Sequence, residues 1–593
     1  MGTRGLSPGL GAAPALGAGR AAVGAAVAVE PVAVEPRAED RTGGPRTGPR
    51  SPGWPRAVRG GRAAPLTAGE SRQRGACPAA RRSRVPSAGA AAATLVAAAA
   101  KSAAIAPILA LAALIAFAAA ASNSAARGAA RCPWRRPGWS LLGLGLLCAC
   151  GAEPGPVQRP DLVLLSLDTL RADRLSTYGH HRPTPFLDRF GAEGLVFEHA
   201  YASAPHTAPS HMSLFTGLDP AAHGIPNVNA RSERFPRLSA DIETLPEVLK
   251  AAGYRTAVLS DGGNLAPELG FDRGFEWRQF GPERWGLRLD SMDEVLSEVP
   301  AHEPLFLFVH AYLTHAPYLP GKAFVGRYTD PAYGGEFRRR YEAAAGVLTP
   351  AHAGAAASFL EPFEGLGAAD LRYLSDLYDE AVASADDCAR RLFARLEAGR
   401  PGSARLEVVL SDHGEEFLEH GRLGHRFGLG LELLRVPLLM RGAGLGPRRV
   451  ADPVGLVALP NTLLALLGFE ARPFAEPGFE ALARDPAARE ERAWFQQLLG
   501  RPETGSIEGL IVGGLQRADF RLPEGLEVRY ADLETGDRPP PEGALAEELA
   551  GRLRARGELN QGRLRAHPLG ASLPLSQEQR ENLTRLGYVG EGR

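Results

Sequence analysis

The chain has 593 residues, which is too long for one ordinary domain and long enough to bury a large hydrophobic core. Its 67 basic residues balance 67 acidic ones, so the overall charge indicates no polyanionic partner such as nucleic acid. The first 150 residues carry 19 Lys or Arg and 5 Asp or Glu, which leaves the remainder of the chain acidic. Five cysteines are too few for a disulfide framework in a chain of this length.

We expect residues 1–130 to be a disordered, low-complexity leader, or to result from a gene start placed too far upstream. Residues 1–90 are mostly Gly, Ala, Pro and Arg without hydrophobic periodicity, and such a segment cannot bury enough apolar surface to offset the entropy lost on ordering. The run Ala103–Ala121 is about long enough to span a bilayer, although it is mostly Ala and contains Pro107.

Residues 131–150 have the three parts of a secretory signal. Arginines come first, Ser140–Leu147 is a short hydrophobic run, and the segment ends Leu147-Cys148-Ala149-Cys150. This ending resembles the lipobox of bacterial lipoproteins, in which Cys150 would carry the lipid, and residues 151–158 would be a linker. We expect a membrane-anchored protein of the bacterial cell envelope that faces the periplasm, held by the lipid or by the span at 103–121.

From residue 159 onward, short apolar runs alternate with amphipathic segments. This pattern predicts an α/β fold with a large, mostly parallel sheet and helices on both faces. The expected strands are Leu162–Leu167, Tyr254–Ser260, Leu305–Ala311, Leu406–Leu410 and Val436–Met440. The expected helices include Pro185–Gly194, Leu245–Ala252, Asp379–Leu396 and Leu456–Leu467, and Cys388 is expected to be a buried thiol on the third of them.

We expect residues 159–493 to form the main domain and residues 494–593 a small α+β subdomain with a tail. In that subdomain a small sheet from about Trp494 is expected to be covered by the helix Leu545–Arg556. The segment Gln577–Leu586 is also expected to have a structural role.

Polar residues follow two of the expected strands. Asp168 ends the first strand, and Asp412 and His413 end the fourth. Ligands of such folds bind beyond the carboxyl ends of the strands, and oxygen and nitrogen ligands together suit Zn, Mn, Ca or Mg. Glu415 and Glu416 follow directly, but a solvated acidic turn is the preferred interpretation of that pair.

A hydroxyl precedes a third expected element. Thr207 stands just before Pro209, which favours the first turn of a helix that would run towards Thr216. The free N–H groups of that turn would face an anion.

Taken together, these segments resemble the sulfatase branch of the alkaline phosphatase superfamily. The resemblance runs from Arg159 to about Asp537 and implies that family's α/β fold and a hydrolase of sulfate or phosphate esters. Further motifs follow in the family's order: Thr184-Pro185-Phe186-Leu187-Asp188, Gly253-Tyr254-Arg255-Thr256-Ala257, Gly270-Phe271-Asp272-Arg273-Gly274-Phe275, the histidine-bearing segment Val309–Tyr318, Leu434-Arg435-Val436-Pro437-Leu438, Tyr530-Ala531-Asp532-Leu533 and Leu586-Gly587-Tyr588-Val589.

The resemblance implies a divalent metal and its ligands. Asp168 is similar to the family's first metal carboxylate, and Asp412 and His413 to the second carboxylate and its neighbouring ligand. Thr207 stands at the position of the nucleophile, where it would also contact the metal.

The resemblance also implies which histidines meet the substrate. His315 and His425 would face its anionic group and act in catalysis, either by donating to a non-bridging oxygen or by protonating the leaving group. His211 and His315 are the expected substrate-binding residues.

The chain departs from the family's pattern at three places. Sulfate-cleaving members convert the Cys or Ser of Cys/Ser-x-Pro-Ser-Arg into formylglycine, whereas this chain reads Thr207-Ala208-Pro209-Ser210-His211. Threonine cannot become that aldehyde, because its extra methyl group would leave a ketone. The family's second early Asp is Thr169 here, and its Gly-Lys-Trp-His segment is Asp261-Gly262-Gly263-Asn264.

We therefore expect Thr207 to act as a plain hydroxyl nucleophile whose pKa a bound dication lowers. The covalent intermediate would be a threonine ester that a second displacement must hydrolyse. Phosphoryl groups undergo such paired displacements readily, so the chemistry favours phosphate esters while the resemblance favours sulfate esters. Both stay open, and so does the choice between one metal and two, for which His420 is a further candidate.

Two other functions remain as alternatives. One is a phosphoethanolamine-type phosphotransferase, and the other is a catalytically inactive lipoprotein that binds a glycan. The substrate would be a small molecule or a glycan or lipid ester, with specificity set by insertions such as Gly321–Phe363 and Arg472–Arg501, which contain no motif.

Overall fold

The computed structural model describes residues 159–585 except 230–231, 261, 281–288, 346–358, 361–364, 426, 490–491, 499–505, 524, 534–535 and 542. The expected leader, candidate span, signal and linker, all before residue 159, lie outside the described residues. The same is true of the tail motif after residue 585. No helix in the described part of the chain is both long and apolar enough to cross a bilayer.

The centre of the fold is an eight-stranded sheet with the order β13-β2-β12-β8-β1-β7-β5-β6. Five neighbouring strands of this sheet are parallel: β8 (Arg405–Leu410), β1 (Asp161–Leu167), β7 (Leu305–Ala311), β5 (Arg255–Ser260) and β6 (Trp277–Phe280). The mostly parallel sheet expected from the sequence is therefore confirmed.

The other edge of the sheet changes direction. Here β12 (Leu438–Gly442) runs antiparallel to both β8 and β2 (Leu195–Phe197), and β13 (Arg448–Val450) pairs with β2 in parallel. The expected strand Val436–Met440 is split, because β11 (Arg435–Val436) pairs instead with β3 (Ala200–Tyr201). Pro437, at the break, has no N–H to donate to a continuous ladder.

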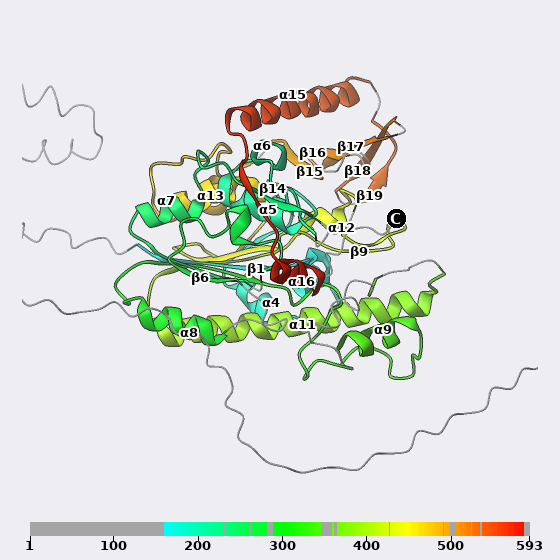
Figure 1. Cartoon of the computed structure of the whole chain (residues 1–593), viewed down its shortest axis with the longest axis horizontal. Coiled ribbons are helices and arrows are strands. Elements are labelled where there is room, and N and C mark those ends of the chain that lie inside the picture. The colour runs from blue at the N-terminus through cyan, green and yellow to red at the C-terminus, as the bar shows by residue number, and fades with distance from the viewer. Residues whose placement is uncertain are drawn as a thin grey trace, which may run out of the picture. The chain divides into compact units, whose positions relative to one another are not determined.

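Helices cover both faces of the sheet (Figure 1). On one face lie α4 (Pro185–Ala192), α8 (Leu289–Glu298) and α11 (Ala368–Gly399). On the other lie α5 (Thr207–Thr216), α7 (Leu245–Ala251) and α13 (Leu459–Leu466). The expected buried helix thiol is confirmed, because Cys388 lies on α11 and is buried.

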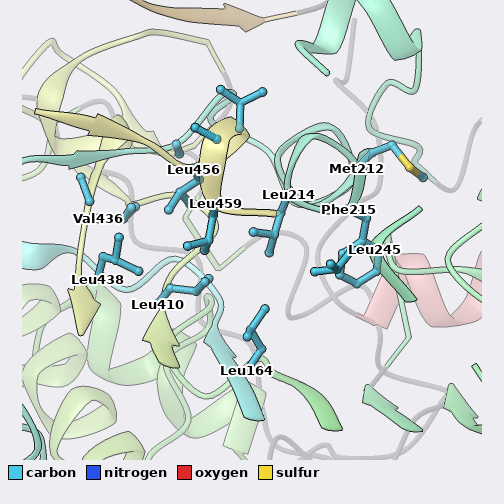
Figure 2. Packing of buried hydrophobic residues seen from close by; sticks show 14 of the residues in the cluster. Leu164, Met212, Leu214, Phe215, Leu245, Leu410, Val436, Leu438, Leu456 and Leu459 are labelled. Atoms are coloured by element: carbon cyan, nitrogen blue, oxygen red, sulfur yellow. The ribbon is translucent and has the colours of Figure 1, made fainter. Parts of the chain in front are cut away.

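Successive side chains of β1 enter separate hydrophobic cores, as the pleat of a strand requires. Leu162 and Leu164 join the core under α5, α7 and α13, whereas Val163 and Leu165 join the core under α11. Figure 2 shows the first core, in which Leu214 of α5 lies between its helix and the sheet residues. This packing holds the N-terminal end of α5 against the carboxyl edge of the sheet.

The remaining short elements connect these layers. They are β14 (Val454–Gly455), the hairpin β9 (Glu416–Phe417) and β10 (Leu423–Gly424), the helices α6 (Pro220–His223), α9 (Glu336–Ala345), α12 (Leu431–Leu434) and α14 (Glu480–Arg484), and 3₁₀ turns at Ala172–Arg174, Ser176–Tyr178, Pro267–Leu269 and Leu456–Ala458.

The C-terminal part has the expected sheet and covering helix. Strands β15 (Trp494–Leu498), β16 (Ser506–Val512), β17 (Leu515–Leu522), β18 (Gly525–Asp532) and β19 (Gly536–Arg538) form an antiparallel sheet. Helix α15 (Ala544–Ala566) packs Leu549 and Leu553 on it, then β20 (Gly570–Pro574) pairs with β4 (Arg234–Arg237), and α16 (Gln577–Arg585) follows.

A buried ion pair joins the end of α11 to the start of the sheet. Nε and Nη2 of Arg400 donate to Asp161 Oδ2 and Oδ1 at 2.8 and 2.9 Å, and the two side chains are 1% and 3% exposed. Asp161 Oδ1 also accepts the N–H of Leu305 at 2.8 Å. The pair therefore connects α11, β1 and β7.

Asp161→Asn should lower the free energy of unfolding by about 3–5 kcal/mol, because it leaves the Arg400 guanidinium buried without a countercharge. Urea denaturation followed by circular dichroism measures this loss. The matched control is Glu548→Gln, which breaks the exposed pair with Arg552 on α15 and should leave stability unchanged. Equal effects of the two variants would contradict the prediction.

Candidate active site

The acidic residues expected to bind metal meet at one edge of the sheet. β1 and β8 are parallel neighbours in which Ser166 pairs with Leu410, so Asp168 and Asp412 emerge side by side. One ligating atom from each of Asp168, Asp412 and His413 lies within 4.8 Å of the others, and all three residues are buried.

Thr207 joins this cluster as the first residue of α5. Its Oγ1 lies 3.4 Å from Nε2 of His413, and its hydroxyl interacts with the carboxylate of Asp168. Ser210, one turn later, donates its hydroxyl to the carbonyl oxygen of Asp412 at 2.7 Å. The helix expected from Pro209 therefore brings a hydroxyl to the acidic pair.

Two of the N–H groups at the start of α5 already have hydrogen-bond partners. The N–H of Ala208 donates to Asn227 Oδ1 at 3.3 Å, and that of Ser210 donates to the His206 carbonyl at 3.1 Å. Pro209, between them, has no N–H. These two N–H groups are therefore not available to an anion in this conformation.

The two buried carboxylates fit a divalent cation. Asp168 Oδ1 and Asp412 Oδ2 accept no hydrogen bond of good geometry from the described residues. Their ion-pair partners in the described part of the chain are all histidines, with His413 Nε2 at 3.7 Å from the former oxygen and 3.5 Å from the latter. Burial raises the pKa of Asp168, although His315 and His413 oppose this effect. Two carboxylates and an imidazole in a buried space are a suitable ligand set for a dication.

The backbone orients His413 as a ligand. Its Nδ1 donates to the carbonyl oxygen of Gly414 at 3.0 Å, which leaves Nε2 facing Asp168 and Asp412. Burial alone would lower the pKa of His413, but Asp412 and Asp168 outweigh it and raise that pKa above its usual value. A proton on Nε2 and a metal ion would therefore compete for the same position.

A chain of hydrogen bonds between buried side chains connects Thr207 to Asp168. Burial lowers the pKa of His211 to about 3 and that of His310 to about 4, so both are neutral at pH 7. His211 Nδ1 donates to the Thr207 carbonyl at 2.9 Å, so its Nε2 accepts the Ser166 hydroxyl at 2.9 Å. Ser166 Oγ then accepts from His310 Nδ1 at 3.1 Å. His310 Nε2 lies 3.3 Å from Asp168 Oδ2, so this chain of side chains ends at the Asp168 carboxylate.

Two further histidines lie at the cluster. The ring of His425 is 4.5 Å from that of His413 and 5.1 Å from that of His315. His425 Nδ1 donates to Glu415 Oε1 at 3.1 Å, and His315 Nδ1 donates to the Ala316 carbonyl at 2.8 Å. Burial lowers the pKa of His315 to about 4, although Asp168 opposes this effect.

A profile of the sulfatase family, described as Sulfatase, matches residues 160–469, which is more than half of the 593-residue chain. The chain belongs to the sulfatase family. This confirms the resemblance seen in the sequence.

Two curated relatives match parts of the chain. An N-acetylgalactosamine-6-sulfatase of Sus scrofa is 29% identical over 251 residues, which are 34% of this chain and 48% of that protein. An arylsulfatase of Hemicentrotus pulcherrimus is 25% identical over 299 residues, covering 47% of this chain and 52% of the relative. The chain thus spans about half the length of these curated relatives.

Solved structures share the fold. The phosphonate monoester hydrolase of Agrobacterium radiobacter superposes with a TM-score of 0.52 at 18% identity, over 69% of this chain and 96% of that chain. The superposition confirms the α/β fold predicted from the sequence.

The residues that depart from the sulfatase pattern have structural partners here. Thr169, at a positive φ of 57°, donates its hydroxyl to the Thr314 carbonyl at 2.7 Å, and Thr314 donates back to the Asp168 carbonyl. These bonds hold a backbone conformation that a β-branched residue rarely adopts. Asn264 bonds both polar groups of the Val228 backbone, at 2.7 and 3.1 Å, while Asp261 lies outside the described residues.

The burial or the partners of some candidate site residues differ from what the sequence predicted. His211, expected to bind substrate, is 0% exposed and has both ring nitrogens hydrogen-bonded, which argues for a supporting role. The solvated acidic turn expected at Glu415 and Glu416 is wrong, because the two residues are 0% and 2% exposed. His420 lies near Glu416 and Glu432 and belongs to a separate cluster.

Sequence reasoning assigned no role to Ser166 or His310. Both residues belong to buried strands, and a polar residue in a mostly apolar strand is the signal that could have found them. Nothing in the local sequence shows that they bond each other across β1 and β7, where Ser166 pairs with His310.

His223 supports the start of α5. Its Nδ1 accepts the N–H of Ile225 at 3.0 Å, so its proton lies on Nε2 and is donated to the Pro209 carbonyl at 3.2 Å. Burial lowers the pKa of His223 from 6.5 to about 3. The folded protein therefore holds this ring neutral at pH values where the unfolded chain protonates it.

The free energy of unfolding should fall as the pH drops from 6.5 towards 3, because the unfolded chain then binds a proton that folded His223 excludes. One such histidine contributes up to about 1.4 kcal/mol per pH unit. His223→Gln should reduce the dependence of the unfolding free energy on pH by that amount. The contributions of the other buried histidines should remain. Urea denaturation between pH 4 and pH 7 measures both slopes, and equal slopes would contradict the prediction.

Adding a divalent metal should raise Tm, because the ion-pair partners that the described residues offer to the buried carboxylates of Asp168 and Asp412 are imidazoles alone. At a metal concentration about 100-fold above Kd the gain is about 2.7 kcal/mol, or a few degrees, and a chelator should reverse it. Asp412→Asn should reduce the gain. Asp376→Asn, a carboxylate that pairs with Arg182 away from the site, is the control and should keep the full gain in Tm. A wild-type Tm that is insensitive to metal would contradict the prediction.

Proposed function

We propose that this sulfatase-family protein is a metal-dependent hydrolase of sulfate or phosphate esters in which Thr207 is the nucleophile. The observation that carries the proposal is the position of the Thr207 hydroxyl, which lies 3.4 Å from His413 and beside the carboxylate of Asp168. Formylglycine is made from serine or cysteine. The residue at this position is threonine, so the formylglycine reaction is excluded here.

Asp168, Asp412, His413 and Thr207 would hold the cation. A bound dication lowers the pKa of a hydroxyl ligand and offsets the negative charge of the ester. The protein contributes the burial, which strengthens these charge interactions, and the orientation of each ligand by its own neighbours. Ser210 fixes the Asp412 backbone and the Gly414 carbonyl fixes His413.

The reaction would proceed in two displacements. In the first, Thr207 Oγ1 loses its proton and bonds to sulfur or phosphorus, while the bond to the leaving alcohol oxygen breaks and that oxygen takes up a proton, so the net proton transfer is from Thr207 to the alcohol. In the second, water attacks the threonine ester, which releases sulfate or phosphate and returns the proton to Thr207. No cofactor oxidation is involved.

Two histidines are suited to move these protons. His425 donates from Nδ1 to the Glu415 carboxylate, which stabilises a protonated ring and favours His425 as the donor to the leaving alcohol. His315 donates from Nδ1 to a carbonyl, and burial lowers its pKa to about 4, so its neutral ring has the lone pair on Nε2. It is therefore suited to accept the proton of the attacking water.

Sulfate and phosphate esters are both proposed substrates. Threonine ester hydrolysis favours phosphorus, because phosphoryl groups undergo paired in-line displacements readily. Similarity to an N-acetylgalactosamine-6-sulfatase favours a sulfate ester of a sugar. The preferred ester in a direct assay decides between them.

Purified full-length protein, stripped of metal and reloaded with Zn²⁺, Mn²⁺ or Ca²⁺, should hydrolyse an aryl sulfate, an aryl phosphate monoester or an aryl phosphodiester. Thr207→Ala should lower kcat by roughly 10³-fold or more, since it removes the nucleophile. Thr207→Ser retains a hydroxyl and should keep measurable turnover. His425→Gln should slow esters with poor leaving groups more than those with good ones.

The Asp376→Asn variant serves as the control for folding and metal loading and should keep wild-type kcat. Turnover in Thr207→Ala equal to wild type would contradict the role of Thr207. Absence of turnover of all three esters by folded, metal-loaded protein would contradict the hydrolase itself.

A further inference from the structure

A second cluster of metal-ligating side chains lies in a cavity apart from the catalytic cluster. The cavity has a volume of about 220 Å³ and lies between the hairpin β9–β10, helix α12 and strands β17 and β18. Glu416, His420 and Glu432 line it, and one ligating atom from each lies within 4.8 Å of the others. None of these side chains takes part in the proposed reaction.

Each of the two carboxylates in this cavity has one buried oxygen without a hydrogen-bond partner among the described residues. Glu416 is 2% exposed and the side chain of Glu432 is 8% exposed. Within the described residues, Glu416 Oε2 and Glu432 Oε1 have no hydrogen-bond partner. Buried carboxylates need a compensating charge, which Arg422 supplies in part to Glu416 and His420 in part to Glu432.

Burial raises the pKa of both carboxyl groups. The pKa of Glu416 rises to about 8, chiefly through burial and then through the neighbouring charge of Glu432, although the charge of Arg422 opposes this rise. The pKa of Glu432 is also raised by burial. Without a bound cation, protons on these carboxyl groups would have to balance their charge. A metal cation can balance that charge at neutral pH.

The cationic side chains that line the cavity have other partners. Arg422 donates to the Phe427 carbonyl, and Arg529 donates to Glu527 Oε1 at 2.7 Å. His420 Nδ1 lies 4.0 Å from Glu432 Oε1, and the imidazole is 26% exposed, so it stands at the opening of the cavity. It can supply a nitrogen ligand from the solvent side.

The chain is shaped to present these oxygens. A Cβ atom on Gly430 would lie 1.9 Å from Glu432 Oε1, so glycine at this position leaves the room that this carboxylate occupies. Glu415 and Glu416 are neighbours, but Glu415 bonds His425 at the catalytic cluster while Glu416 lines the cavity. Consecutive side chains of extended backbone point to opposite sides, which separates the two sites.

We propose that Glu416, His420 and Glu432 form a second divalent-cation site, distinct from the catalytic one, that takes a Zn²⁺- or Mn²⁺-type ion. Two carboxylates with one imidazole suit these metals better than Ca²⁺, which takes oxygen ligands.

The site would stabilise the loop that carries His425. Glu416 begins the hairpin before His425, and Glu432 lies on α12 after it, so one ion would connect the two ends of this loop. The backbone already joins them, because the N–H of Glu415 donates to the Glu432 carbonyl at 3.1 Å. Gln516 of β17 donates to the Leu429 carbonyl at 2.9 Å, which adds the C-terminal sheet to the same unit.

The test is zinc binding by the metal-stripped full-length chain, with metal per chain measured by atomic emission after equilibrium dialysis. The wild type should bind two equivalents, and the double variant Glu416→Gln/Glu432→Gln should bind one. Asp168→Asn/Asp412→Asn should lose the other equivalent. Gly430→Ala removes no ligand but displaces Glu432, and should weaken the second equivalent at least about tenfold.

Glu419→Gln is the matched control, because Glu419 lies on the same hairpin turn and pairs with Arg171 instead of entering the cluster. The Glu419→Gln variant should bind both zinc equivalents and show the full zinc-dependent rise in Tm. The variants of Glu416, Glu432 and Gly430 should lose part of that rise. Wild-type zinc binding and Tm gain in the double variant would overturn the proposal. If the wild type binds only one zinc ion and the Asp168→Asn/Asp412→Asn variant loses it, the second site is also overturned. If the wild type binds only one zinc ion and the Glu416→Gln/Glu432→Gln variant loses it, the catalytic metal is contradicted instead.

Discussion

Two aspartates at the ends of adjacent parallel strands share one buried space, and the rest of the site follows from how their charge is balanced. The pairing of β1 with β8 places Asp168 and Asp412 at the same edge of the sheet. Both residues are at most 1% exposed. Charged carboxylates in such a space need a countercharge, because water cannot solvate them there. The ion-pair partners that the described residues offer them are imidazoles, which leaves a position for a dication.

Neighbouring side chains hold each member of this cluster in place. The chain from Thr207 through His211, Ser166 and His310 to Asp168 connects the start of α5 to the sheet. Because each hydrogen bond sets the direction of the next, these groups form one ordered network. The site is therefore built into the core, and its geometry depends on the packing of α5 shown in Figure 2.

The same physical constraint recurs in the cavity beside the C-terminal sheet. Glu416 and Glu432 are buried without hydrogen-bond partners among the described residues at the oxygens named above, as Asp168 and Asp412 are. The loop between these glutamates carries His425, so charge balance in the cavity and the position of a proposed proton donor are connected. Strand β17 of the C-terminal sheet contacts the same loop, because Gln516 donates to the Leu429 carbonyl at 2.9 Å.

The sequence by itself determined the strands, the helices and the residues at their ends. Apolar runs predicted β1, β5, β7 and β8, and the polar residues after two of them identified Asp168, Asp412 and His413. These features are local, because the period of a strand and the residues at its end can be read within a few positions. Motif order added the family, and a family profile confirmed it.

Only the tertiary structure decided burial and partners. It placed His211 inside the core and gave Ser166 and His310 their hydrogen bonds. It also buried Glu415 and Glu416 on opposite sides, and it gave the Ala208 N–H a side-chain partner at the start of α5. The reason is that these contacts join distant parts of the chain: Thr207 and His413 are 206 positions apart, and Ser166 and His310 are 144 apart. No local pattern of residues records which distant side chain will lie opposite.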